Sequence, residues 1–137
     1  MLNRVMTQLG SADPNDVGER TRTIAVDFDG VLAEYSGWKG VEVLGAPRMD
    51  VIKVLRVLRQ EGWKIVVHTT RSEQHIIDYL SLHDIPYDEI NRNSHYPTAG
   101  GKPVATVYWD DRAVRYSGDA FQDLEVIRSF RTWSGRE

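Results

Sequence analysis

Carboxylate side chains form two close groups along this 137-residue chain: Asp27 and Asp29 are separated by one residue, and Asp110 is followed directly by Asp111. Carboxylates that lie together repel one another unless a cation sits among them, and hard oxygen ligands suit Mg²⁺. Two acidic residues at this spacing on a strand point the same way, so that one can attack while the other moves protons. The two groups are therefore candidates for a cation site with its own nucleophile.

A hydroxyl and an ammonium group accompany the carboxylates. Thr69 is suited to donate a hydrogen bond to a phosphate oxygen, and Lys102 is suited to offset the phosphate charge. Thr70 is the alternative hydroxyl, and Arg71 is a candidate lining residue that a surface ion pair explains nearly as well. Lys102 lies between Gly101 and Pro103, a pattern that is also typical of an exposed turn.

Short apolar runs lead into these polar residues. Such runs are typical of buried strands in a parallel sheet, and helical spacing of apolar residues occurs between them. Ligands bind beyond the carboxyl ends of strands in such sheets, which is where the candidate residues fall. The expected strands are 23–28, 63–68, 85–90 and 104–109, and the expected helices run from Pro47 to a C-cap at Gly62, from Ser72 to about His83, and from Ala120 to Trp133.

Strands that alternate with helices predict an α/β fold: a three-layer α/β/α sandwich with a central parallel sheet, Rossmann-like in type. Residues 23–137 are long enough for one domain. Residues 1–22 are polar and rich in turn signals, and we expect an N-terminal extension with a short helical piece near Leu2–Leu9.

The composition excludes several classes of protein. Hydrophobic residues make up 41% and charged residues 27%, as in an ordinary soluble domain, and the net charge of −3 gives no basic field for nucleic acid or anionic membrane. The absence of cysteine excludes disulfides, thiolate metal sites and a cysteine nucleophile. No apolar run approaches the ~20 residues of a membrane span. We expect a cytoplasmic protein without a membrane partner.

Four segments, in order, resemble the motifs of the haloacid dehalogenase superfamily. Residues 26–31 (VDFDGV) resemble the first motif, and residues 66–71 (VVHTTR) resemble the second, with Thr69 at the hydroxyl position. Lys102 can serve as the third, and residues 107–111 (VYWDD) resemble the fourth in its adjacent-diacid form. One such motif alone is weak, but the ordered set at expected strand ends is specific.

The resemblance implies a role for each matching residue. Asp27 is expected to be the nucleophile that forms an aspartyl-phosphate, and Asp29 the acid and base. Mg²⁺ is expected to be held by Asp27, the main-chain carbonyl of Asp29 and Asp110, with Asp111 assisting. Thr69 and Lys102 are expected to hold the phosphoryl group, with Thr70 and Arg71 as further substrate contacts. The second aspartate, Asp29, distinguishes the phosphatase and mutase branches, so the expected activity is phosphomonoester hydrolysis.

The family inserts cap domains after the first motif or between the second and third, and both segments are short here. We therefore expect no large cap, with residues 33–46 as a short flap. An open site admits a bulky phosphoester, such as a nucleotide, a nucleic acid end or a phosphoprotein. A neighbouring subunit that supplies the lid is the alternative, and the sequence identifies neither the substrate nor the oligomeric state.

Other functions and other residues stand beside these expectations. A receiver domain also uses an acidic pair, a Thr and a Lys, but no Asp ends a strand between Asp29 and Thr69. A silent partner-binding relative and a phosphotransferase are the further alternatives, although transfer usually needs a cap to exclude water.

His68 lies within an apolar strand and is expected to be a satisfied core histidine. Tyr35, Trp38 and Arg112 have no assigned contact, the remaining histidines (75, 83 and 95) show no zinc-ligand spacing, and Trp63, Trp109 and Trp133 are expected in the core.

Overall fold

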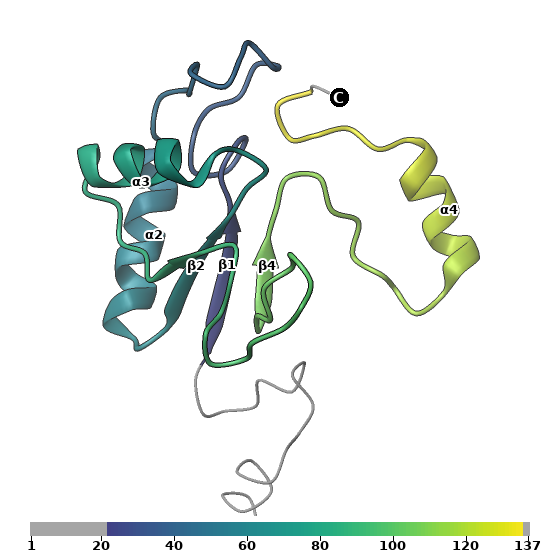
Figure 1. Ribbon diagram of the computed structural model, residues 1–137. Coiled ribbons are helices and arrows are strands. Elements are labelled where there is room, and N and C mark those ends of the chain that lie inside the picture. Colours follow the sequence, from purple (N-terminus) through teal and green to yellow (C-terminus); the bar gives the residue numbers. More distant parts are fainter. Residues whose placement is uncertain (1–21, 136–137) are drawn as a thin grey trace, which may run out of the picture.

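Four short parallel strands form the centre of the structure, a computed structural model that describes residues 22–135 (Figure 1). Within these residues the strand order is β3-β2-β1-β4, so the first strand of the chain is central. A parallel neighbour on each side requires crossover connections, which here contain helices or long loops. The strands are β1 (Thr23–Asp27), β2 (Lys64–His68), β3 (Glu89–Ile90) and β4 (Val107–Trp109).

The described helices differ in how close they lie to the sheet. Helices α2 (Met49–Gln60) and α3 (Glu73–Leu82) lie on one side, and α4 (Ala120–Arg128) stands apart on the other side (Figure 1). No large cap domain interrupts the described residues. The predicted α/β class, with a parallel sheet and no large cap, is confirmed. The sheet is small, and α4 stands away from it (Figure 1).

The core lies between the sheet and the α2–α3 layer. Strands β1 and β2 are buried along nearly their whole length, as expected for apolar runs without alternation. Phe28, Ile52, Leu55, Ile65 and Leu80 are among the largest fully buried side chains, and they come from both layers. This packing holds the carboxyl ends of β1 and β2 in a fixed position.

Several element ends differ from the expected ones. The third strand begins at Glu89 rather than at residue 85, because the Ile85 N–H donates back to the Leu80 carbonyl and so completes the end of α3. Ser72 occupies the N-cap of α3 without a side-chain capping hydrogen bond. At the end of α2 the C-cap is Glu61, and Gly62 follows with φ of 89°, a left-handed conformation that stops the helix.

The last helix is shorter than predicted. It ends at Arg128, where the Ser129 hydroxyl donates to the Glu125 carbonyl. The chain then returns toward the sheet. Trp133, in this returning segment, is 60% exposed and lies outside the core, contrary to the prediction. Trp63 and Trp109 are partly buried against the core.

Two further predictions concern the ends of the chain and the membrane. The expected helical piece at residues 2–9 lies outside the described residues, as does all of the N-terminal extension except Arg22. None of the described helices has the length and apolarity needed to cross a bilayer.

Candidate active site

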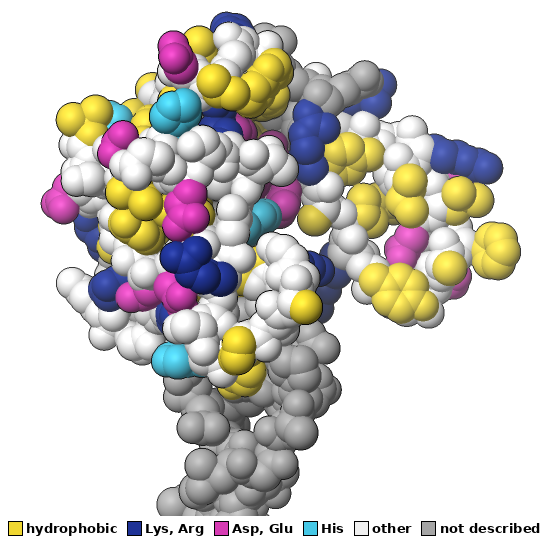
Figure 2. All heavy atoms as spheres, in the orientation of Figure 1, with side chains coloured by type: hydrophobic (Ala, Val, Ile, Leu, Met, Phe, Trp, Pro, Cys, Tyr) yellow, Lys and Arg dark blue, Asp and Glu magenta, His cyan; other side chains and the backbone are white. Residues whose placement is uncertain are grey.

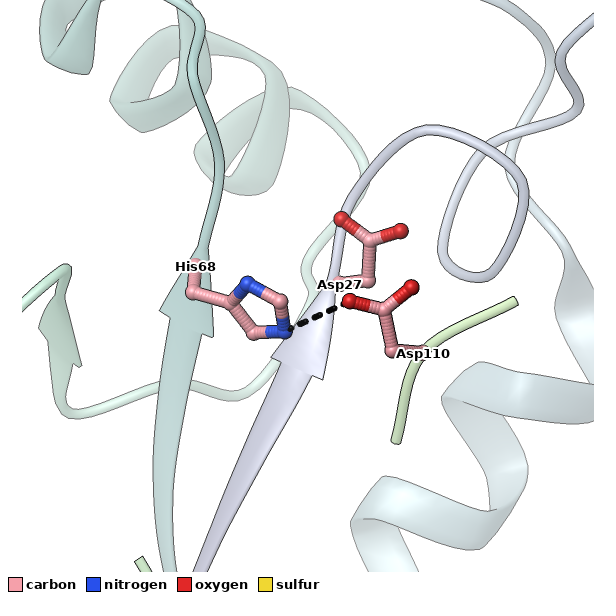
Figure 3. A group of neighbouring side chains, drawn as sticks. All are labelled: Asp27, His68 and Asp110. Atoms are coloured by element: carbon pink, nitrogen blue, oxygen red, sulfur yellow. Dashed lines mark ion pairs between the residues drawn. The ribbon is translucent and has the colours of Figure 1, made fainter. Parts of the chain in front are cut away.

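The ends of three adjacent strands bring polar side chains into one row. In the register of the sheet, Asp27 of β1 lies opposite His68 of β2, and Val26 lies opposite Trp109 of β4. Asp110 follows Trp109 and so lies at the level of Asp27. The row His68–Asp27–Asp110 is therefore a direct consequence of strand register (Figure 3).

A cavity of about 710 Å³ opens above this row. All of the predicted site residues except Arg71 line it. Sequence positions far apart thus meet at the carboxyl edge of the sheet, where open α/β folds bind ligands. The lining residues with polar or aromatic side chains are Asp27, Asp29, Tyr35, Trp38, His68, Thr69, Thr70, Asn91, Lys102, Tyr108, Asp110, Asp111 and Arg112.

Asp27 lies in an environment that is unfavourable for an ionised carboxylate. Burial raises the pKa of Asp27 to about 8, and a hydrogen bond with the Asp111 carboxylate and the negative charges of Asp110 and Asp111 act in the same direction. The Phe28 N–H, which donates to Asp27 Oδ1 at 2.9 Å, acts against them. Protein groups alone therefore disfavour the ionised form of Asp27.

Asp29 is fixed by Arg71, which does not line the cavity. Arg71 Nε donates to Asp29 Oδ2 at 2.8 Å, while its terminal nitrogens donate to the carbonyls of Val41 at 3.1 Å and Val43 at 3.0 Å. The Arg71 side chain is 2% exposed. It therefore holds the loop between Ala33 and Ala46 against the site, and its role as a substrate contact stays a prediction.

Thr69 has a hydroxyl group that is set to donate. Its Oγ1 accepts the Arg71 N–H at 3.0 Å, so the hydroxyl hydrogen is left for another acceptor. Asn91 holds the Thr69 backbone from both sides, because its side chain accepts from the Thr69 N–H at 2.8 Å and donates to the Thr69 carbonyl at 3.0 Å. Asn91 itself has φ of 58°, which asparagine tolerates better than most residues. Nothing in the sequence pattern singles this asparagine out.

Lys102 and the aromatic residues form the outer wall. Lys102 Nζ lies 4.5 Å from the centre of the Tyr108 ring, a cation–π distance, and the residue is exposed. Trp38 is 58% exposed, and the Arg71 guanidinium lies over its ring at 4.9 Å. An exposed ammonium group and aromatic rings thus lie around the carboxylates of the cavity.

Asp111 depends on the glycine of the first motif. Gly30 has φ of 88°, and a Cβ built at this position would overlap the Asp111 carboxylate. The missing side chain thus gives both the turn after β1 and the room for Asp111. Trp133 reinforces this turn, because its indole N–H donates to the Gly30 carbonyl at 2.7 Å.

His68, which its apolar sequence context placed in the core, is a functional candidate. It is half-buried, lines the cavity, and its Nε2 lies 3.7 Å from Asp110 Oδ2 (Figure 3). Burial lowers the pKa of His68, Lys102 acts in the same direction, and Asp110 opposes them. Its position opposite Asp27 follows from strand pairing. The sequence therefore indicates a site role for His68 only once the strand register is known.

The residues present fit a divalent cation. Within residues 22–135, the buried atoms Asp29 Oδ1, Asp111 Oδ1 and His68 Nε2 have no hydrogen-bond partner. One oxygen or nitrogen atom from each of Asp27, His68 and Asp110 lies within 4.8 Å of the others. Unpaired buried acceptors beside crowded carboxylates are the environment that a cation stabilises.

Comparison with known proteins supports the fold alone. No family model and no curated protein matches the chain. A solved structure of a conserved protein from Bacteroides thetaiotaomicron is similar, with a TM-score of 0.57 and 23% sequence identity. The match covers 85% of this chain and 97% of that protein. At this level of identity the likeness concerns the backbone and leaves the site chemistry to the residues described above.

Proposed function

We propose that this chain is a divalent-cation-dependent phosphomonoester hydrolase of the haloacid dehalogenase type, with Asp27 as its nucleophile. One observation carries the proposal: residues from all four family-like segments line a single cavity at the carboxyl edge of a parallel sheet. That set contains a nucleophile, a second carboxylate, a hydroxyl, an ammonium group and a candidate cation site. Hydrolysis of a phosphate monoester through an aspartyl-phosphate uses these groups together.

In the first step, a carboxylate oxygen of Asp27 attacks phosphorus and the bond from phosphorus to the leaving oxygen breaks. Asp29 gives its proton to that oxygen, so the alcohol leaves neutral. The Thr69 hydroxyl and the Lys102 ammonium group hold the phosphoryl oxygens, whose negative charge they offset.

In the second step, water attacks phosphorus and Asp29 takes the proton that the water loses. The bond between phosphorus and Asp27 breaks, which releases inorganic phosphate and restores both aspartates. Asp27, the Asp29 main-chain carbonyl and Asp110 would hold Mg²⁺, with Asp111 close by. A bound divalent cation supplies positive charge that keeps Asp27 ionised and stabilises the transferring phosphoryl group.

The test is hydrolysis of p-nitrophenyl phosphate by the wild-type protein and by Asp27→Asn, with added Mg²⁺ or with a chelator. We expect cation-dependent turnover in the wild type and a loss of about 10³-fold or more in the variant. Asp78→Asn, an exposed change on α3, is the matched control and should leave the rate unchanged. Circular dichroism checks that each variant is folded. Equal rates for Asp27→Asn and wild type refute the nucleophile assignment.

A further inference from the structure

The cation position that the proposed function requires has a nitrogen donor beside its carboxylates. His68 and Asp27 are paired in the β1–β2 register, and parallel strands point such partners to the same face of the sheet. Figure 3 shows the imidazole of His68 directed toward Asp110, which lies beside Asp27 at the end of β1. The three side chains offer two oxygen atoms and one nitrogen atom within 4.8 Å of one another.

The His68 imidazole lacks a partner on this side. Its Nε2 is buried and, among residues 22–135, accepts or donates no hydrogen bond. The distance of 3.7 Å to Asp110 Oδ2 is too long for one. A buried unpaired ring nitrogen costs free energy, and a cation between His68 and Asp110 would remove that cost.

We propose that His68 Nε2 is a further protein ligand of the cation, beside Asp27 and Asp110, and makes the site select a first-row transition ion over Mg²⁺. The proposal rests on the proposed function for the position of the cation at Asp27 and Asp110. Imidazole nitrogen binds transition ions well, whereas Mg²⁺ takes oxygen ligands almost exclusively. Two carboxylates, the Asp29 main-chain carbonyl and one imidazole still leave positions for water and for a phosphate oxygen on a six-coordinate cation.

Direct binding of Co²⁺ and of Mg²⁺, measured by titration calorimetry on metal-free protein, tests this. Relative to wild type, His68→Gln should weaken Co²⁺ binding about tenfold or more and change Mg²⁺ binding by less than about twofold. His95→Gln is the matched control, because His95 lines a separate cavity with Trp63 and Lys64 at the opposite end of β2. Its binding of both ions should equal that of wild type.

A spectroscopic readout keeps the test independent of activity and of small changes in stability. In the Co²⁺-loaded protein, the ring protons of a ligating histidine are shifted paramagnetically in the NMR spectrum. We expect one such histidine in wild type and His95→Gln and none in His68→Gln, with His68→Asn as the second variant if the glutamine protein does not fold.

The outcomes separate this inference from the proposed function. Co²⁺ binding that needs Asp27 and Asp110 but is unaffected by His68→Gln overturns the role of His68 and leaves the phosphatase proposal standing. His68-dependent Co²⁺ binding without any phosphatase activity supports the ligand and overturns the enzyme. Failure of wild type to bind either ion overturns the role of His68 and removes the cation from the proposed function.

Discussion

Asp27 illustrates how a single residue can be unsuited to its role until a ligand arrives. A nucleophilic carboxylate must be ionised, yet burial, Asp111 and Asp110 together raise the pKa of Asp27 to about 8. A cation among these carboxylates reverses the sign of the local field. The same crowding that disfavours the metal-free site therefore favours cation binding.

This environment predicts a pH-dependent stability for the metal-free protein. The pKa of Asp27 rises from an ordinary aspartate value of 3.8 to about 8 on folding, so between these values the folded state binds more protons and the free energy of unfolding falls as pH rises. Asp27→Asn removes the ionisation and should be more stable than wild type by about 2 kcal/mol above that range, after solvent screening is allowed for. Near pH 3.8 the ionisation of Asp27 should contribute little to the difference in free energy of unfolding between the two proteins.

Urea unfolding in a chelator at about pH 5 and about pH 9 measures the difference. Asp78→Asn again serves as the control, since its carboxylate is exposed on α3. A stability difference between Asp27→Asn and wild type that is the same at both pH values would contradict the assigned environment.

Gly30 gives a second prediction at this scale. Gly30→Ala places a side chain in the left-handed region, which costs about 1–2 kcal/mol, and also displaces the Asp111 carboxylate. Gly37→Ala is the matched control, because Gly37 has φ of 109° and open space around its Cβ position. Urea unfolding should show a larger loss for Gly30→Ala, and only this variant should lose phosphatase activity. Equal effects of the two substitutions on activity would show that Asp111 needs no room at residue 30.

At the scale of elements, two side chains, those of Arg71 and Tyr79, hold the loop after β1 in place. Arg71 ties Asp29 and the carbonyls of Val41 and Val43 together, and the Tyr79 hydroxyl adds a bond of 2.7 Å to the Gly45 carbonyl. A guanidinium group can serve these acceptors at once, because its five N–H donors spread in a plane. Arg71 thus connects the flap, residues 33–46, to Asp29, which is expected to move protons.

Arg71→Lys should release this loop. Lysine can keep the ion pair with Asp29 but cannot also reach both carbonyls, so the free energy of unfolding should fall by about 1–3 kcal/mol. Limited proteolysis should cut the loop faster than in wild type, with Arg92→Lys as the control because Arg92 is 63% exposed. Equal cleavage rates in wild type and Arg71→Lys would mean that other contacts hold the loop.

Elements with strong local signals could be predicted from the sequence. Strands β1 and β2 are apolar runs that end in polar residues, and their positions came within a residue of the expected ones. The third strand was overestimated, since Ile85 satisfies the end of α3 and leaves only Glu89 and Ile90 in the ladder. Local periodicity does not show which of two neighbouring elements receives a given N–H.

The candidate site was predictable where its residues follow strands and unpredictable where pairing decides. Asp27, Thr69 and Asp110 stand at strand ends, so a parallel sheet alone brings them together. His68 faces the site because of its register with Asp27, and Trp133 reaches Gly30 across a separation of 103 residues. Both positions depend on tertiary structure, and the spacing of residues along the sequence predicts neither.

The two sides of the whole molecule differ in how much apolar surface they expose. Helices α2 and α3 cover one face, whereas α4 exposes a group of apolar side chains that is visible at its surface in Figure 2. A lid supplied by a neighbouring subunit stays a prediction, as does the bulky phosphoester as substrate. The apolar side chains of α4 with the greatest exposure are Phe121, Val126 and Ile127.

The return of the chain after α4 connects this outer part to the site. Trp133→Phe keeps an aromatic ring under the Arg48 guanidinium, which lies 4.6 Å from the ring centre, but removes the indole N–H bond to the Gly30 carbonyl. We expect the free energy of unfolding to fall by about 0.5–1.5 kcal/mol. Trp38→Phe, at another exposed tryptophan, should change it less, and an unchanged stability in Trp133→Phe would argue against the docking of this segment.

The central claim is that Asp27 carries the phosphoryl group during turnover, and chemical trapping tests it most directly. Borohydride reduces an acyl phosphate, so quenching the reaction with it converts a phosphorylated aspartate to homoserine, which mass spectrometry of the peptides locates. We expect homoserine at residue 27 in the wild-type protein only when substrate and divalent cation are both present. Turnover with no homoserine at residue 27, or with homoserine at residue 29 instead, would contradict the claim.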